Sequence, residues 1–419
     1  MADGALGAVF RVREFRVVWV AELLSIAGDQ LARVALAVLV YGRTGSAAWA
    51  AATYALTFLP ALLGGVLLSG LADRYRRREV MIASDVLRAV LVGAMAIPRL
   101  PLWALCALLV VVVLLGSPHT AAQGALLPEI LHGELYERGL AVRQITSQTA
   151  QLVGFASGGV LVAAISPSMA LLGNAASFAL SALLVRAGLV DRPRPGASDE
   201  GDAPADAPVG GLRGAVAALF EIATDPRRRA LVLLAWLVGW YVVPEALAAP
   251  YAAQLGEGPA VVGVLMAADP LGSVVGAWLF VRFVSAQTRA RVVGVLAVGA
   301  GLPLVVCLFR PAVPLTLVLW AVSGMLSTAY LLQTQASFVR ATPVVGRGRA
   351  IGVAASGIIA AQGMAVLIGG VLADEWDPST AIAVAGAVGA LLSVGAAVAW
   401  HRANRHHREP ADTTVSASG

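Results

Sequence analysis

The stretch 101–127, PLWALCALLVVVVLLGSPHTAAQGALL, contains no Asp, Glu, Lys or Arg. A helix of about twenty residues, rising 1.5 Å per residue, crosses a hydrocarbon core of ~30 Å, so this stretch is long enough to span a membrane. Similar apolar runs recur along all 419 residues, of which 58% are hydrophobic and 13% charged. A soluble protein carries roughly a quarter charged residues. We therefore expect a polytopic membrane protein, not a soluble enzyme, a secreted module or a nucleic-acid binder.

Twelve apolar runs can be read as membrane-spanning helices, which predicts an all-α fold. Most connections between them are very short, as at 98–101 and 166–168, so successive helices should be antiparallel neighbours. The predicted spans are 16–41, 47–71, 80–97, 101–127, 141–165, 168–187, 229–252, 259–282, 291–309, 312–335, 350–373 and 379–400.

One polar linker divides these spans six and six. The stretch 191–211, DRPRPGASDEGDAPADAPVGG, is rich in Pro, Gly and acidic residues, and this composition predicts disorder. The predicted units are an N-terminal half at 1–187, a linker at 188–228, a C-terminal half at 229–400 and a disordered tail at 401–419. Within the linker, a short amphipathic helix on the membrane surface is indicated by the spacing of Leu212, Val216, Leu219 and Ala223.

The arginines predict the orientation of the chain. All 30 basic residues are arginines, and if the N-terminus is cytoplasmic, nearly all of those outside the spans fall in cytoplasmic loops and tails. The opposite side has only Arg43, Arg99 and Arg310. This asymmetry predicts that both termini lie in the cytoplasm of a bacterial inner-membrane protein.

Several kinds of chemistry are excluded by what the sequence lacks. Without lysine there is no phosphate-binding Gly-rich loop, so ATP-driven pumping by this chain is excluded. No Gly-x-Ser-x-Gly, paired catalytic Asp or His-Glu-x-x-His pattern occurs, and we expect neither an enzyme nor a metal site. Cys106 and Cys307 both lie in apolar runs, which indicates no disulfide. We expect no cofactor and a proton gradient as the energy source.

The two halves contain an internal repeat. A shift of 211 residues places Gln151 on Gln362 and Pro167-Ser168 on Pro378-Ser379. The same shift places Gly158-Gly159-Val160-Leu161 on Gly369-Gly370-Val371-Leu372. Two six-helix halves in parallel repeat suit a carrier that works by alternating access, with its substrate site between the halves near the middle of the membrane.

These features lead to a resemblance. The stretch 69–81, SGLADRYRRREVM, resembles the cytoplasmic loop signature of the major facilitator superfamily, with Ser69 and Arg76 where that signature usually has glycine. A resemblance to the macrolide-efflux and enterobactin-exporter branch is carried by SIAGDQLARVAL at 25–36, ASDVLRA at 83–89, ALLPEIL at 125–131 and GNAASFALSALL at 173–184.

The resemblance implies a proton-coupled secondary transporter that exports lipophilic drugs or natural products. Its partners would be a small-molecule substrate, protons and membrane lipid, and we expect a monomer. One alternative is an importer of a sugar or other nutrient with the same fold, whose cavity would be dominated by hydrogen-bonding side chains. The lining expected here is instead Ala, Val and Leu with few amides. The other alternative is a membrane sensor or partner protein that transports nothing.

The first span carries three ionisable residues on one stripe. Glu22, Asp29 and Arg33 lie within about 40° of one another on a helix, so they should face the protein interior or water. Asp29 and Arg33, spaced i and i+4, are expected to pair. Asp29 is our candidate for a proton-coupling or cation-binding carboxylate, and the alternative is that the pair only anchors helix packing.

Two further acidic residues lie deep in the seventh and eighth spans. Glu245 follows Trp240 and Tyr241 by about one turn, and such a group could bind a lipophilic cation through cation–π contacts and charge pairing. Alternatively, Glu245 reaches water at the outer end of its span. Asp269 precedes Pro270, so a helix break or a packing role is an equal possibility.

Other polar residues in the spans allow two interpretations each. His119 is either a neutral histidine bonded to a neighbour or part of a proton relay. The polar stripe on the fifth span either lines the cavity or joins two helices, and comprises Gln144, Gln148 and Gln151.

The last two groups are structural in character. The resemblance implies a charge latch that holds one access state, formed by Asp73, Arg74, Arg77, Arg78, Asp85 and Arg88. The alternative is an ordinary basic loop. Gly154, Gly158 and Gly159 provide a face of small residues for close contact between helices.

Overall fold

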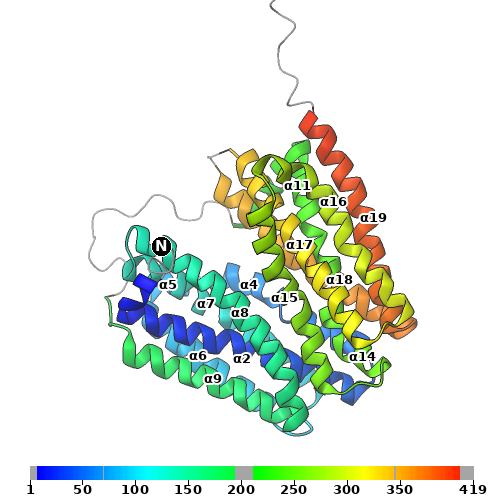
Figure 1. Cartoon of the computed structure of the whole chain (residues 1–419). Helices are drawn as coiled ribbons and strands as arrows, with labels where there is room; N and C mark the ends of the chain where they lie inside the picture. The colour runs from blue at the N-terminus through cyan, green and yellow to red at the C-terminus, as the bar shows by residue number, and fades with distance from the viewer. Residues whose placement is uncertain (1–6, 69, 194–210, 344–345, 406–419) are drawn as a thin grey trace, which may run out of the picture.

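A computed structural model describes residues 7–68, 70–193, 211–343 and 346–405, and regular secondary structure in these residues is helical (Figure 1). The elements of the N-terminal half are η1 Ala8–Arg11, α2 Arg13–Thr44, α3 Ala47–Ala55, α4 Leu59–Leu67, α5 Leu71–Arg74, α6 Arg77–Met95, α7 Leu102–Ile130, α8 Glu134–Ala164 and α9 Pro167–Gly188.

The linker and the C-terminal half follow. Their elements are α10 Gly211–Thr224, α11 Pro226–Trp236, α12 Val238–Tyr241, α13 Val243–Ala246, α14 Ala248–Gln254, α15 Pro259–Phe283, α16 Ala286–Val305, η2 Val306–Phe309, α17 Val313–Ala341, α18 Arg347–Glu375 and α19 Pro378–Arg405.

Ten helices in these described ranges are long and apolar enough to cross a membrane. The two predicted spans outside this set are α6 and α8. The first contains Asp85 and Arg88, and the second contains Arg143 and a run of glutamines, so both are more polar than the others. Large apolar side chains such as Leu67, Trp103 and Phe283 are exposed, as suits surfaces that face lipid. The all-helical, multi-pass fold is confirmed.

Two of the predicted spans are interrupted rather than single continuous helices. The second is divided into α3 and α4, and Pro60 lies in the first turn of α4. The seventh is divided into α11, α12, α13 and α14, with Pro244 in the first turn of α13. Proline has no backbone N–H and clashes with the preceding turn, so each helix restarts close to its proline.

The helices repeat at the spacing found in the sequence. Helix α8 ends at Ala164 and α18 ends at Glu375, while α9 begins at Pro167 and α19 begins at Pro378. Both pairs are 211 residues apart, so the offset seen in the sequence is also the offset between equivalent helices.

The two halves meet at one end of the molecule, and we call this region the closed end. Figure 1 shows the two bundles touching around α14 and separating toward the N-terminus. At the closed end the backbone of Gly159 in α8 lies against that of Gly263 in α15, and Gly370 in α18 lies against Ala51 in α3. Asp374 also accepts hydrogen bonds from the Ser46 hydroxyl and the Ala47 N–H, each 2.5 Å long.

The predicted linker and tail are only partly described. A helix, α10, occupies the predicted amphipathic segment, and its Val216 and Leu219 are exposed. Helix α19 continues to Arg405, so the start of the predicted disordered tail is wrong: residues 401–405 extend the last helix. Residues 194–210 and 406–419, where disorder was also predicted, lie outside the described residues.

Candidate functional site

A cavity of about 680 Å³ lies within the N-terminal half, which is within the usual size range of small-molecule sites. Helices α2, α4, α6, α7, α8 and α9 contribute to its walls, together with Thr57 between α3 and α4. Its apolar lining includes Leu36, Val92, Met95 and Leu109. The polar lining comprises Glu22, Ser25, Asp29, Arg33, Thr57, Arg88, Ser117, His119, Thr120, Gln123, Arg143 and Asn174.

This lining bears on two predictions, one about its composition and one about its place in the fold. We expected Ala, Val and Leu with few amides, whereas polar side chains make up about half of the lining residues, although only Gln123 and Asn174 are amides. We also expected the site between the halves, and all the residues that line this cavity belong to the N-terminal half.

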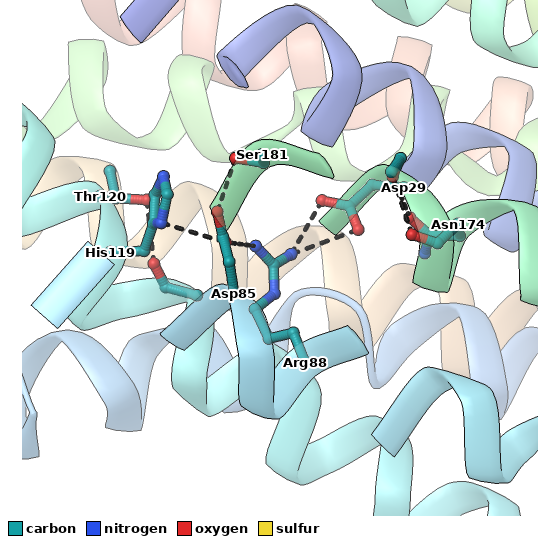
Figure 2. A network of polar contacts seen from close by, with 9 residues as sticks. Asp29, Asp85, Arg88, His119, Thr120, Asn174 and Ser181 are labelled. Atoms are coloured by element: carbon teal, nitrogen blue, oxygen red, sulfur yellow. Dashed lines mark hydrogen bonds and ion pairs between the residues drawn. The ribbon is translucent and has the colours of Figure 1, made fainter. Parts of the chain in front are cut away.

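The predicted pair of Asp29 with Arg33 is wrong. The Asp29 carboxylate instead accepts hydrogen bonds of 3.0 and 3.2 Å from one guanidinium nitrogen of Arg88 on α6 (Figure 2). Arg33 lies over the rings of Tyr54 and Phe58, with its guanidinium carbon 5.8 and 5.3 Å from the two centroids. The partner of Asp29 is therefore on another helix, and Arg33 has aromatic neighbours.

Asp85 joins Arg88 to a second polar group. Its side chain is fully buried, accepts a 2.6 Å hydrogen bond from Ser181 on α9, and lies 3.8 Å from Arg88. His119 Nδ1 on α7 is 3.1 Å from Asp85 Oδ1, although the two atoms are not aligned as a hydrogen bond. Figure 2 shows Arg88 between Asp29 and Asp85, with His119 and Ser181 beyond. We call Asp29, Arg88, Asp85 and His119 the buried polar chain, in which Asp29 is the cavity end, with its side chain 35% exposed.

Glu22 is neutralised from a different helix. Arg143 on α8 donates two hydrogen bonds, of 2.6 and 2.7 Å, to the Glu22 carboxylate. Paired N–H groups facing two carboxylate oxygens form a strong, geometrically specific ion pair. This pair connects α2 to α8 at the wall of the cavity.

The predicted group of aromatic residues and acids in the C-terminal half does not line this cavity. Tyr241 is buried and donates a 2.6 Å hydrogen bond to the Ala297 carbonyl oxygen. Trp240 packs beside Gly389 of α19. Both aromatic residues therefore belong to the packing of the C-terminal half.

The two deep acids lie where the halves approach each other. The Glu245 carboxylate is buried and accepts a hydrogen bond from the Tyr54 hydroxyl of the N-terminal half. Arg33 and Asp269 are among its charged surroundings. Asp269 also lies 3.5 Å from the Ser273 hydroxyl and packs against Gly324. Glu245 is thus enclosed by protein and does not reach water as one alternative held.

The members of the predicted latch whose side chains are described have different partners. Arg77 contacts the Glu129 carboxylate, and Arg78 donates a hydrogen bond to the Arg186 carbonyl oxygen. Arg74 is exposed, and the side chain of Asp73 lies outside the described residues. Asp85 and Arg88, which the resemblance groups with the loop charges, are buried in the polar chain.

The predicted glycine face makes two different contacts. Gly154 and Gly158 pack against α2, where added Cβ atoms would lie 2.8 Å from Gln30 and 3.3 Å from Leu31. Gly159 points the other way, toward α15 in the C-terminal half. In the polar stripe, Gln151 donates hydrogen bonds to Gln148 and Ser147 on its own helix. None of the three stripe glutamines lines the cavity.

Sequence reasoning missed several members of the site. Arg143 carries no sequence signal for its pairing with Glu22, because the two residues are 121 positions apart. Ser181 and Tyr54 carry no distinctive pattern, and only the fold brings them to Asp85 and Glu245. A signal existed for Asp85 and Arg88: their i, i+3 spacing on a predicted span suggests one helix face.

Comparison with known protein families matches residues 18–244 and 230–417 to the Major Facilitator Superfamily. The multidrug efflux pump Tap of Mycobacterium tuberculosis is 26% identical over 374 residues, covering 84% of this chain and 85% of that pump. Tap of Mycolicibacterium fortuitum is 26% identical over 371 residues, covering 84% of this chain and 88% of the pump.

Solved structures of transporters share the fold. A variant of the nucleoside transporter NupG has a TM-score of 0.74 at 12% identity, covering 93% of this chain and 99% of that one. A POT family transporter in complex with 5-aminolevulinic acid has a TM-score of 0.73 at 12% identity, covering 94% and 97%. Because the family match extends over both halves, the chain belongs to the Major Facilitator Superfamily and is a secondary transporter.

Proposed function

We propose that this transporter exports lipophilic drugs or natural products in exchange for protons. It would act as a monomer in the bacterial inner membrane, with both termini in the cytoplasm and no cofactor. The observation that supports it most is the position of Asp29, which lines a cavity of drug size and is held by an arginine shared with a second carboxylate.

The direction is supported by the end at which the molecule is closed. Glu22 and Arg143 lie about two and a half turns from the starts of α2 and α8, toward the end that carries η1. The cavity therefore extends toward the arginine-rich end, while the opposite end is closed by contacts between the halves. If the arginine-rich side is cytoplasmic, substrate enters from the cytoplasm. The relatives named as multidrug efflux pumps support export.

The chemistry of the buried polar chain supports proton coupling. When Asp29 is ionised, it attracts Arg88 at 3.0 Å, and Asp85 attracts the same guanidinium from 3.8 Å. A proton on Asp29 removes the first attraction, so Arg88 is then held by Asp85 alone. Protonation thus changes the charge and shape of the cavity wall, which is what exchange between a proton and a substrate requires.

Proton release in inside-out vesicles tests the proposal. A pH-sensitive dye should report substrate-triggered proton release for the wild type with a panel of macrolides and lipophilic ions, and none for Asp29→Asn. Glu14→Gln is the matched control, because Glu14 pairs with Arg192 outside the cavity. Proton movement that persists in Asp29→Asn would remove Asp29 from the coupling. A well-folded wild type that moves no protons with the whole panel would contradict proton exchange.

Import of a polar nutrient is the second candidate, and the polar lining favours it. Several of the polar side chains are already paired with each other and less available to a substrate, because Glu22 binds Arg143 and Asp29 binds Arg88. Uptake in right-side-out vesicles separates the candidates. Accumulation of a labelled sugar or nucleoside driven by an inward proton gradient would support import and contradict export.

A further inference from the structure

We infer that the cavity selects amphipathic molecules with an anionic group, and that Arg33 binds this group. The anion would be a carboxylate, a sulfonate or a phosphate ester on an apolar body. This inference rests on the proposed function in one respect, because it takes the cavity as the transport site. It differs from our expectation for lipophilic cations.

The charges that line the cavity are unequally matched. Its two carboxylates each have a guanidinium partner: Glu22 binds Arg143 and Asp29 binds Arg88. Among the described residues, no carboxylate lies within ion-pair distance of Arg33. A cation that enters the cavity would have to compete with an arginine for either carboxylate, whereas an anion would find an uncommitted guanidinium.

Arg33 is also held in place for this task. The rings of Tyr54 and Phe58 lie against its guanidinium at cation–π distance. Aromatic contact does not use the five N–H donors of the group, so they remain able to bind two oxygens of one anion. A guanidinium that is already ordered loses little conformational entropy when it binds, which favours affinity.

The charged groups around Arg33 do not satisfy it by direct contact. Glu245, across the boundary between the halves, interacts electrostatically with Arg33 but receives its direct hydrogen bond from Tyr54. Asp269 interacts electrostatically with Glu245 in turn. An anion bound to Arg33 would therefore weaken the attraction of Arg33 for Glu245, so cavity occupation would loosen the closed end.

The remaining lining suits the other parts of such a ligand. Gln123 is buried in the wall, and its side-chain nitrogen has no acceptor in the described part of the chain, so rotation of the amide would offer a donor to a bound oxygen. The apolar body would contact Val92, Met95, Leu109 and Leu171. The aromatic residues expected to hold a cation, Trp240 and Tyr241, do not line the cavity.

A pair of matched fluorescent ligands tests the inference. 1-Anilinonaphthalene-8-sulfonate and N-phenyl-1-naphthylamine share one aromatic body and differ in the sulfonate. Saturable binding to the full chain in nanodiscs is measured without a proton gradient, with protein-free nanodiscs subtracted. Because a charge-assisted hydrogen bond strengthens binding by roughly 10- to 100-fold, the wild type should bind the sulfonate that much more tightly.

Variants at Arg33 test whether this residue binds the anionic group. Arg33→Gln should lower the affinity for the sulfonate to that for the neutral amine and leave the amine unchanged, while Arg33→Lys should retain most of the preference. The inference would be overturned if Arg33→Gln lowered the affinity for both ligands equally, or for neither. It would also be overturned if the wild type bound the cation rhodamine 6G more tightly than the sulfonate. A variant whose thermal unfolding matches the wild type excludes misfolding as the cause.

The two proposals can fail separately. If anion selectivity is absent but Asp29-dependent proton release persists, only the substrate class is wrong. If anions bind through Arg33 but no substrate triggers proton release, the anion site is supported and proton-coupled export is contradicted.

Discussion

Tyr54 and Glu245 join the two halves of the molecule through a hydrogen bond from a phenol of α3 to a buried carboxylate of α13. The bond lies beside Arg33, which lines the cavity, so the cavity and the boundary between the halves share one cluster of side chains. Any motion that opens the closed end must break this bond.

Tyr54→Phe should favour opening of the closed end. The change keeps the ring over Arg33 but removes the donor to a buried carboxyl oxygen, and leaving such an acceptor unsatisfied costs about 1–3 kcal/mol. Spin labels at positions 49 and 376, both exposed tryptophans, should then show a larger population at long distance. Tyr75→Phe, at an exposed tyrosine, serves as control. An unchanged distance distribution would mean that the bond does not hold the halves together.

Gly159→Ala and Gly370→Ala should each force the closed end apart. An added Cβ on Gly159 would lie 2.7 Å from Gly263, and one on Gly370 would lie 2.4 Å from Ala51. Overpacking of this kind typically costs about 1–3 kcal/mol. The same spin-label distances should lengthen, whereas Gly352→Ala, where a Cβ has nothing within 4 Å, should leave them unchanged. If the spin-label distances were the same in all three variants, this packing would be contradicted.

Asp374→Ala should loosen the start of α3 from the opposite half. The Asp374 carboxylate accepts hydrogen bonds from Ser46 and Ala47 at the N-terminus of α3, so it acts as a helix cap supplied by the other half. Losing such a cap costs about 1 kcal/mol. Hydrogen–deuterium exchange of the first amides of α3 should accelerate several-fold. Glu257→Ala, at an exposed residue before α15, should not alter it.

The stabilising effect of Asp377 should depend on pH. Burial raises the pKa of this carboxyl, but hydrogen bonds from Ser379, Thr380 and Gln254 outweigh it and hold the pKa well below its ordinary value. A lowered folded pKa gives stability that is fully present above the unfolded pKa of about 3.9 and is lost as the pH falls through the folded pKa.

Asp377→Asn should therefore lower the thermal unfolding temperature most at neutral pH. The difference from the wild type should shrink as the pH falls below about 4. A thermal-shift series from pH 7 downward measures it, with Glu375→Gln as control for loss of a nearby carboxylate. A difference that grows on acidification would mean that Asp377 does not act as an ionised group.

The sequence predicted the architecture well because it depends on properties that act residue by residue. Apolar length identifies most spans, and the repeat gives an offset that the ends of α8 and α18 reproduce. The stripe of Glu22, Asp29 and Arg33 also faces one cavity, since helix geometry alone determines which side chains share a face.

The partners of those side chains could not be predicted in the same way. Asp29 has a basic residue one turn away in Arg33, yet it binds Arg88, and Glu22 binds Arg143, more than a hundred residues distant. Such pairs depend on which helices are neighbours and how each is rotated. The resemblance also grouped Asp85 and Arg88 with the charges of the preceding loop, because nearness in sequence does not reveal which side chains are buried.

The contacts at Gly159 and Gly370 occupy equivalent positions in the repeat, and each brings a glycine to within packing distance of the opposite half. Dispersion attraction at such contacts falls away within about an ångström of separation, unlike the attraction between charges, which extends across a gap. A half-parted molecule would have lost both contacts and gained nothing in return. The closed end should therefore open cooperatively, as an all-or-none step, with few molecules at intermediate separations.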